Sequence, residues 1–268
     1  MKRLAALTLF TALIGSSFAV NAELSGRDIM QKVKDRDDGK NAIMDMDMIL
    51  IDGKGNTRER TIRSFRRDAP ANPKDNESIM FFLSPANVEN TGFLTYDFDD
   101  GDKDDDQWLY LPALKKVKRI AAADKSGSFM GSDFTYADMS SPDLDDYEYK
   151  VMKEVEIDGH KAWQILSKPK TEDEIERTGY TQSVAFVRQD NYVVVRSVSW
   201  VKKGNKQKFM EVKELKQIDG IWTSTEITMT TKKGKETEHA SVLRMKDIKY
   251  NQPMDDALFT QRRLSNGL

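Results

Sequence analysis

The chain has 268 residues, no cysteine and a formal charge of −2 at pH 7. The absence of cysteine excludes disulfide bonds and thiol-linked lipids, so the folded state must depend on its core. A slightly acidic chain is also a poor candidate for a nucleic-acid-binding protein, because such proteins gain much of their affinity by neutralising phosphates.

The first 22 residues have the pattern of a secretory signal peptide. Lys2 and Arg3 precede an apolar run at 4–20, and Val20-Asn21-Ala22 offers a cleavage site flanked by small residues. Removing residues 1–22, with their two basic residues, would take the formal charge from −2 to −4. No later segment is long and apolar enough for a membrane-spanning helix, and no Pro/Gly/Ser-rich linker divides the rest. We therefore expect a periplasmic protein with a single domain at 23–268.

A helix is predicted at the start of this domain, over 23–36. Ser25 is placed to cap it, Asp28 follows three residues later, and Ile29, Met30 and Val33 form one apolar stripe. This is the one helix that the sequence pattern predicts.

A strand pattern begins at residue 42 and recurs to the end of the chain. Met44, Met46, Met48 and Leu50 alternate with other residues and give one strand a strongly apolar face. Further strands are predicted at 57–67, 78–83, 91–98, 107–111, 116–120, 147–156, 161–168, 180–188, 192–201, 207–217, 221–231 and 236–249. Turn sequences join many of them as hairpins, and helical crossovers are missing, so the pattern predicts a long antiparallel meander. Twist makes such a sheet curl towards a barrel or split into a sandwich.

A barrel in the outer membrane is a rival interpretation of a signal peptide followed by many strands. The strands at 57–67 and 206–217 carry charges on both faces. Each lysine or arginine at the middle of a bilayer costs roughly 2–4 kcal/mol, so the membrane-spanning interpretation is disfavoured.

Catalytic and metal-binding motifs are not found in the sequence. His160 and His239 stand apart, and neither a nucleophile elbow nor a phosphate-binding loop is present. The acidic segment 97–107 could bind calcium or form a solvated turn, and both interpretations stay open. We assign no catalytic residue, no metal site and no cofactor.

Two basic runs lie on predicted strands. They allow two interpretations, namely charged edge strands that block unwanted pairing, or a docking surface for an acidic partner or lipid headgroups. The residues that would form the docking surface are Arg63, Arg66, Arg67, Lys116, Lys118 and Arg119.

The segment 126–147 is rich in large apolar residues but follows no regular period. Phe129, Met130, Phe134 and Tyr136 cannot all face water cheaply, since burying one such side chain is worth roughly 1.5–3 kcal/mol. We expect the segment to fold back on the apolar face of the curled sheet, either completing an ordinary core or closing a binding cavity. The methionines favour a cavity slightly, because methionine adapts to varied apolar partners.

Two motifs carry a family resemblance. "QWLYLPALKKVKRI" at 107–120 and "SGSFMGSDFTYADM" at 126–139 resemble the LolA-like outer-membrane lipoprotein-sorting proteins of Gram-negative bacteria. The closer likeness is to a branch of uncharacterised periplasmic proteins, often encoded beside transporters of the resistance-nodulation-division (RND/MMPL) type. The resemblance implies a mainly β fold, an incomplete, half-open antiparallel barrel whose mouth is closed by helices or loops. It also implies a cavity for acyl chains.

The resemblance implies a non-enzymatic carrier that moves a lipoprotein acyl chain, a lipid or another hydrophobic molecule between envelope partners. The residues expected to line or cover its cavity are Met44, Met46, Met48, Leu50, Trp108, Tyr110, Phe129, Met130, Phe134 and Tyr136. Two alternatives stay open: an accessory protein of an inner-membrane transporter with no cargo of its own, and a hydrolase with paired acids.

Overall fold

The computed structural model describes residues 24–101 and 103–268, so the expected signal peptide lies outside the described residues. Helices in this part of the chain are α1 (Gly26–Lys34), α2 (Glu172–Thr178) and α3 (Gln261–Asn266), and short 3₁₀ turns accompany them. The strands are β1 (Asn41–Asp52), β2 (Thr57–Asp68), β3 (Asn76–Ser84), β4 (Gly92–Asp97), β5 (Asp106–Leu111), β6 (Lys116–Arg119), β7 (Tyr147–Ile157), β8 (His160–Pro169), β9 (Tyr180–Arg188), β10 (Val194–Val201), β11 (Lys206–Ile218), β12 (Ile221–Lys233) and β13 (Glu236–Tyr250).

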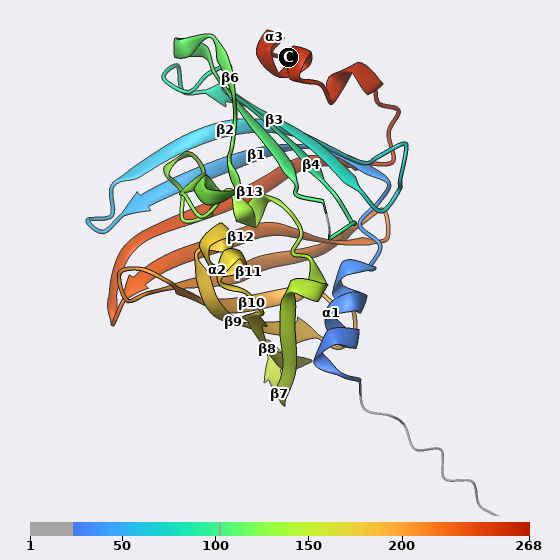
Figure 1. Ribbon diagram of the computed structural model, residues 1–268, viewed down its shortest axis with the longest axis vertical. Coiled ribbons are helices and arrows are strands. Elements are labelled where there is room, and N and C mark those ends of the chain that lie inside the picture. Colours follow the sequence, from blue (N-terminus) through green and yellow to red (C-terminus); the bar gives the residue numbers. More distant parts are fainter. Residues whose placement is uncertain (1–23, 102) are drawn as a thin grey trace, which may run out of the picture.

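All of these strands belong to one antiparallel sheet of 13 strands (Figure 1). Its order is β6-β5-β4-β3-β2-β1-β13-β12-β11-β10-β9-β8-β7. Consecutive strands of the chain are therefore neighbours in the sheet except β6 and β7, and β1 pairs with β13 although the two are far apart in the chain. The two edge strands, β6 and β7, do not pair with each other, and the sheet curls without closing. The expected half-open antiparallel barrel is confirmed.

Along β1 and β13, alternation separates an apolar inner face from a charged outer face. At the β1–β13 pair, Met46 lies opposite Met245 and Met48 opposite Leu243, which places apolar side chains together on the inner face. The residues between them point outward, and Asp47 pairs there with Lys246. The sequence pattern of β1 therefore determines which way this part of the sheet faces.

Helix α1 begins as the sequence predicts. Ser25 is its N-cap, and the reciprocal hydrogen bonds between Ser25 and Asp28 form a capping box. Ile29 is fully buried against the β7 end of the sheet. Gly26 packs closely on β7: an added Cβ would lie 3.0 Å from the Tyr149 Cβ and 3.1 Å from the Lys150 nitrogen, so a larger residue would push the strand and the helix apart.

The connection from β6 to β7, residues 120–146, is called the insert below. It contains four 3₁₀ turns, and it runs across the inner side of the sheet between the two unpaired edges (Figure 1). Met130 and Gly131 both have positive φ angles, 51° and 76°, which reverse the chain so that Ser128 and Thr135 form an isolated β-bridge. The irregular apolar segment of the sequence therefore folds back on the sheet, as expected.

Helix α3 packs against the outer face of β4, β5 and β6. Its Leu264 is fully buried in a cluster with Phe259, Ile79, Phe81, Leu94 and Trp108. Gly92 of β4 allows this contact, because a Cβ there would lie 2.7 Å from Leu264 Cδ1. The protein thus has apolar clusters on both faces of this half of the sheet.

Candidate functional site: the inner face of the sheet and its insert

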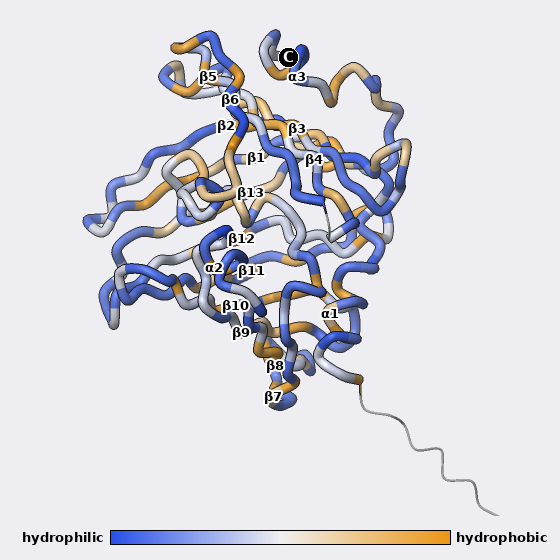
Figure 2. Tube along the Cα trace, viewed as in Figure 1, coloured by the Kyte–Doolittle hydropathy of each residue, from blue (hydrophilic) through white to orange (hydrophobic). Residues whose placement is uncertain are grey.

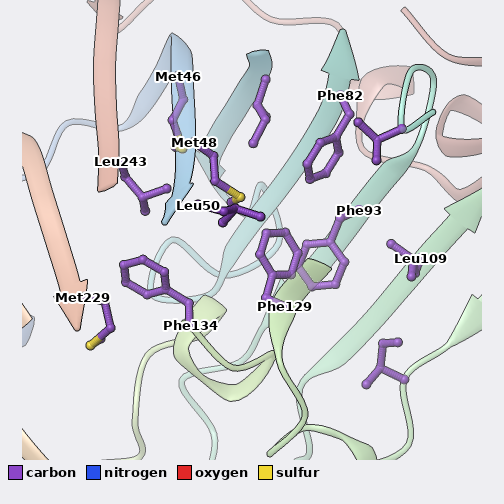
Figure 3. Packing of buried hydrophobic residues seen from close by; sticks show 13 residues of the cluster. Met46, Met48, Leu50, Phe82, Phe93, Leu109, Phe129, Phe134, Met229 and Leu243 are labelled. Carbon is purple, nitrogen blue, oxygen red and sulfur yellow. The ribbon is translucent and has the colours of Figure 1, made fainter. Parts of the chain in front are cut away.

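The inner face of β1 to β5 is packed with large apolar side chains from the insert. Met46, Met48 and Leu50 are 7%, 2% and 1% exposed and lie in one cluster with Phe129 and Phe134. Figure 3 shows these side chains directed into one shared space. The Phe129 ring meets Phe93 edge-on at 5.0 Å between centroids, a favourable geometry for aromatic pairs. Over β1 to β5, side chains of the insert therefore fill the space between the insert and the sheet.

The structure gathers most of the residues expected to line or cover a cavity. Five of them belong to this buried cluster, and Met44, Met130 and Tyr136 pack against it. Trp108 and Tyr110 are not among them: they lie in the outer-face cluster beneath α3. The reason is the two-residue period of β5, whose inward positions are taken by Leu109 and Leu111.

Asp133 fastens the centre of the insert to the sheet. Its side chain is only 2% exposed, and Oδ2 lies 2.7 Å from His239 Nδ1 and accepts a hydrogen bond from Ser241 Oγ at 2.7 Å. Thr231 Oγ1 donates to the other carboxylate oxygen, and the Asp133 N–H donates to Ser241 Oγ at 3.0 Å. A buried carboxylate is costly unless it is paired and hydrogen-bonded, and here β12 and β13 supply the partners.

A second carboxylate, Asp138, fastens the following turn. Its Oδ2 accepts hydrogen bonds from the Thr135 N–H at 2.7 Å and from Tyr180 Oη at 2.9 Å. Lys208 Nζ donates to Tyr180 Oη at 3.2 Å. Burial lowers the pKa of Lys208, and burial followed by the charge of Asp138 raises the pKa of Tyr180 well above its ordinary value. The insert is therefore held by polar contacts at two points.

A cavity of about 430 Å³ lies beside the filled region, between the insert and strands β7 to β12. Small side chains on the inner faces of neighbouring strands leave this space: Ser167, Ser183, Ala185, Ser197 and Ser199. Larger apolar side chains complete its wall: Met30, Phe134, Tyr147, Tyr149, Val194, Met210, Val212, Ile227 and Met229. The volume falls within the roughly 300–1,000 Å³ of small-molecule pockets, and concave, mainly apolar walls are typical of them.

One charged pair borders the cavity. Arg177 of α2 is the only lysine or arginine among the described lining residues. Its Nε and Nη2 donate to the carboxylate of Glu174 at 2.6 and 2.7 Å, and Tyr147 Oη donates to the same carboxylate. Glu174 is buried, so this network holds α2 and β7 together at the wall. Sequence reasoning missed α2 and the small residues, although serine or alanine at alternate positions of adjacent strands is a signal for an unfilled inner face.

The basic residues expected to form a docking surface fall into two groups. Those of β2 are engaged within the protein: Arg63 with Asp45, Arg66 with Asp38 and Asp68, and Arg67 with Glu77 and Asp256. Those of β6 are more exposed, although Arg119 pairs with Asp106 and Lys118 Nζ lies 3.7 Å from Asp124. The structure does not bring the two groups together as one surface.

The acidic segment at 97–106 distributes its carboxylates among different partners. Asp97 accepts from the Ser141 N–H at 2.9 Å, Asp99 pairs with Lys34 at 2.6 Å, and Asp105 accepts from the Phe98 N–H at 3.1 Å. Within 24–101 and 103–268, no group of three or more His, Asp or Glu side chains is arranged to hold a metal ion. In the same ranges, no helix combines the length and apolar character needed to cross a membrane.

Comparisons with known proteins place this architecture. A family model described as "-like: Uncharacterized protein" matches residues 74–266, well over half of the chain. A crystal structure of a DUF1329 family protein from Desulfovibrio piger superposes with a TM-score of 0.80 at 28% identity, covering 89% of this chain and 97% of that one. A domain named for outer-membrane lipoprotein sorting, from Vibrio parahaemolyticus, superposes with a TM-score of 0.79 at 29% identity, covering 90% and 98%.

The chain belongs to the LolA-like family. A LolA superfamily protein from Nitrosomonas europaea has the same fold, with a TM-score of 0.66 at 15% identity over 90% of this chain and 99% of that one. A search of curated proteins found no match. The match to the LolA-like family confirms the resemblance that the two sequence motifs carry.

Proposed function

We propose that this LolA-like protein is a periplasmic carrier that binds an acyl chain of a lipoprotein, a lipid or another hydrophobic molecule. The observation that carries the proposal is the cavity of about 430 Å³ between the insert and β7 to β12. An apolar cargo gains by entering it, because its surface is then removed from water. The name of the Vibrio parahaemolyticus relative, which refers to lipoprotein sorting, supports the same class of cargo.

The insert acts as the lid of this carrier. Phe134 belongs both to the filled cluster and to the cavity wall, so a movement of the insert changes both. When the insert lifts, the inner face of β1, with Met46 and Met48, becomes additional wall for a longer chain. Methionine suits that role, because its flexible side chain repacks around different shapes.

Transfer then needs two states of similar free energy, with the insert closed or lifted. The contacts of Asp133 and Asp138 favour the closed state, and a partner in the envelope would favour the lifted one. The donor and the acceptor are envelope components, and residues 1–22 serve as the signal peptide that directs the single domain at 23–268 to the periplasm. No bond is made or broken in this cycle.

A second candidate function rests on the filled half of the inner face. Phe129 and Phe134 occupy the space over β1 to β5, as they would in an accessory protein with no cargo of its own. Such a protein would act by binding an inner-membrane transporter of the RND/MMPL type. The two functions differ in whether the cavity holds a guest.

Native mass spectrometry and solvent extraction of the purified protein test the carrier. We expect a co-purifying lipid, and we expect Ser197→Phe to lower its occupancy by on the order of tenfold, the equivalent of about 1.4 kcal/mol, because the added ring fills the cavity. Val198→Phe is the matched control, since it adds the same ring to the opposite face of β10 and should leave occupancy unchanged. Equal occupancy in both variants, or no lipid in the unmodified protein, would contradict carriage in this cavity.

A further inference from the structure

The turn between β5 and β6 forms an exposed tip at one edge of the sheet. A 3₁₀ turn at Pro112–Leu114 ends in Lys115, which has a left-handed φ of 49°, and the chain then enters the short edge strand β6. Leu114 is 62% exposed, the largest exposure of any large hydrophobic residue in the described chain. In Figure 1 this turn projects beyond the body of the sheet, on the same side as α3.

Leu114 is not an isolated case at this end of the molecule. Of the four exposed large hydrophobic side chains in the described residues, Leu83 and Leu268 also lie here, and the fourth, Met152, lies on β7 at the other edge of the sheet. Asn90 connects the surroundings of two of them: its N–H donates to the Phe82 carbonyl, next to Leu83, and a Cβ on Gly267 would lie 3.8 Å from its Oδ1. Leu114 follows the end of β5, where Tyr110 pairs with Gly92 at the start of β4. Single exposed leucines need no explanation, but three at one end do.

Positive charge accompanies these leucines. Lys115, Lys116 and Lys118 are exposed around the tip, and the described residues give Lys115 and Lys116 no ion pair. Lys118 has only the contact to Asp124, whose side chain is itself 58% exposed. The tip is therefore cationic on a chain whose overall formal charge is −2. Figure 2 shows hydrophobic and hydrophilic residues side by side at this end.

We propose that this tip is a docking site for an anionic lipid surface, with Leu114 entering the headgroup region and the lysines contacting lipid phosphates. Charge complementarity argues for the lipid, since lysines beside an apolar side chain are attracted to anionic membranes. A protein partner fits less well, because lysine is depleted in protein interfaces and the tip at 112–118 has no tryptophan to provide an anchor. The proposal does not depend on whether the cavity carries a cargo.

The absence of cysteine allows a direct test with one label. Leu114→Cys carries an environment-sensitive dye, and Met152→Cys carries the same dye as the matched control at the β7 edge. The probes are vesicles of phosphatidylcholine alone and of phosphatidylcholine mixed with phosphatidylglycerol. We expect a blue shift at position 114 with the anionic vesicles only, reversed by high salt because salt screens exposed charges, and no shift at position 152.

Sedimentation of the unlabelled protein with the same vesicles supplies the second measurement. We expect Lys116→Glu with Lys118→Glu to weaken binding to the anionic vesicles at least about tenfold, and Lys150→Glu with Lys153→Glu on β7 to leave it unchanged. The proposal is overturned if the protein binds neither vesicle, if it binds both equally, or if the dye at position 114 stays silent while the protein binds. A silent dye together with capture of an acidic protein at the tip would assign the surface to that partner instead.

Discussion

Asp133 shows how a single residue decides the position of an irregular segment. It lies among apolar neighbours, yet β12 and β13 place three side-chain donors around its carboxylate, from Thr231, His239 and Ser241. Ser241 is itself fully buried, so its hydroxyl needs the hydrogen bond to Asp133 just as the Asp133 carboxylate needs the donors around it. Contacts of this kind determine one position for the insert, whereas apolar contacts alone allow sliding.

Replacing this carboxylate should release the insert. We expect Asp133→Ala to lower the free energy of unfolding by about 2–4 kcal/mol, since it leaves buried donors without an acceptor. Urea unfolding measures that loss, and hydrogen exchange should report faster exchange over 126–139. Asp124→Ala, on an exposed part of the same insert, should stay within about 0.5 kcal/mol of the unmodified protein. Equal losses in the two variants would argue against a specific role for Asp133.

Asp97 makes stability depend on pH in the mildly acidic range. Burial, and next the charge of Asp105, raise the pKa of Asp97 to about 6. Because the folded state holds this proton more tightly than the unfolded chain, the stabilising contribution is fully present below the ordinary pKa of an aspartate, is lost as the pH rises to about 6, and changes no further above that. The neighbouring Asp99 makes a contribution to stability with the opposite pH dependence. A hydrogen bond from Lys34 lowers the pKa of Asp99, so its contribution is present at neutral pH and is lost as the pH falls.

Two single variants distinguish the effects of Asp97 and Asp99 on stability. Asp97→Asn should raise the free energy of unfolding at pH 7 by about 1–3 kcal/mol, with the gain disappearing near pH 4, because the amide mimics the protonated acid. Asp99→Asn should lower stability at pH 7, and this loss should also shrink as the pH falls. Chemical unfolding at several pH values gives both curves; a gain for Asp97→Asn that did not change with pH would refute the assignment.

At the scale of elements, local pattern was enough to predict the strands and the first helix. Alternation in 42–50 and the turn sequences between later strands place every strand within a few residues, and Ser25 with Asp28 predicts the start of α1. Helices α2 and α3 were missed because each has only one or two turns, and α3 offers a single buried residue, Leu264. Such short helices are stabilised by what they pack against, and that information is not local.

Leu264 is accordingly the residue on which α3 depends. We expect Leu264→Ala to cost about 2–5 kcal/mol, because it opens a cavity over Gly92 and the outer-face cluster. Leu268→Ala removes the same atoms from a position that is 50% exposed and should cost less than about 0.5 kcal/mol. Thermal unfolding followed by circular dichroism measures both; similar shifts would mean that α3 does not hold this cluster.

At the scale of the whole molecule, the sequence predicts which residues share a face but not which space remains open. The expected cavity residues on β1 and the insert do come together, but the cavity of about 430 Å³ lies towards β8 to β10, where small residues leave room. Serine on a strand usually indicates a face exposed to solvent. The serines of β8 to β10 therefore predict a cavity only when it is also known that the sheet curls around them. Trp108 and Tyr110 show the same limit of sequence-based prediction. Alternation predicts that they lie on one face of β5, but it does not predict that this face points away from the inner side of the sheet.

The pairing of β1 with β13 has a consequence for how the molecule assembles. About two thirds of the chain separates these two strands, yet they meet in the middle of the sheet, and the gap in the barrel falls between two strands from mid-chain. Contacts between such distant segments form slowly, because a long loop must close first. Until the last strand has been synthesised, β1 has an unpaired edge of strongly apolar character, and a chain that stops before residue 236 would keep that edge open to aggregation.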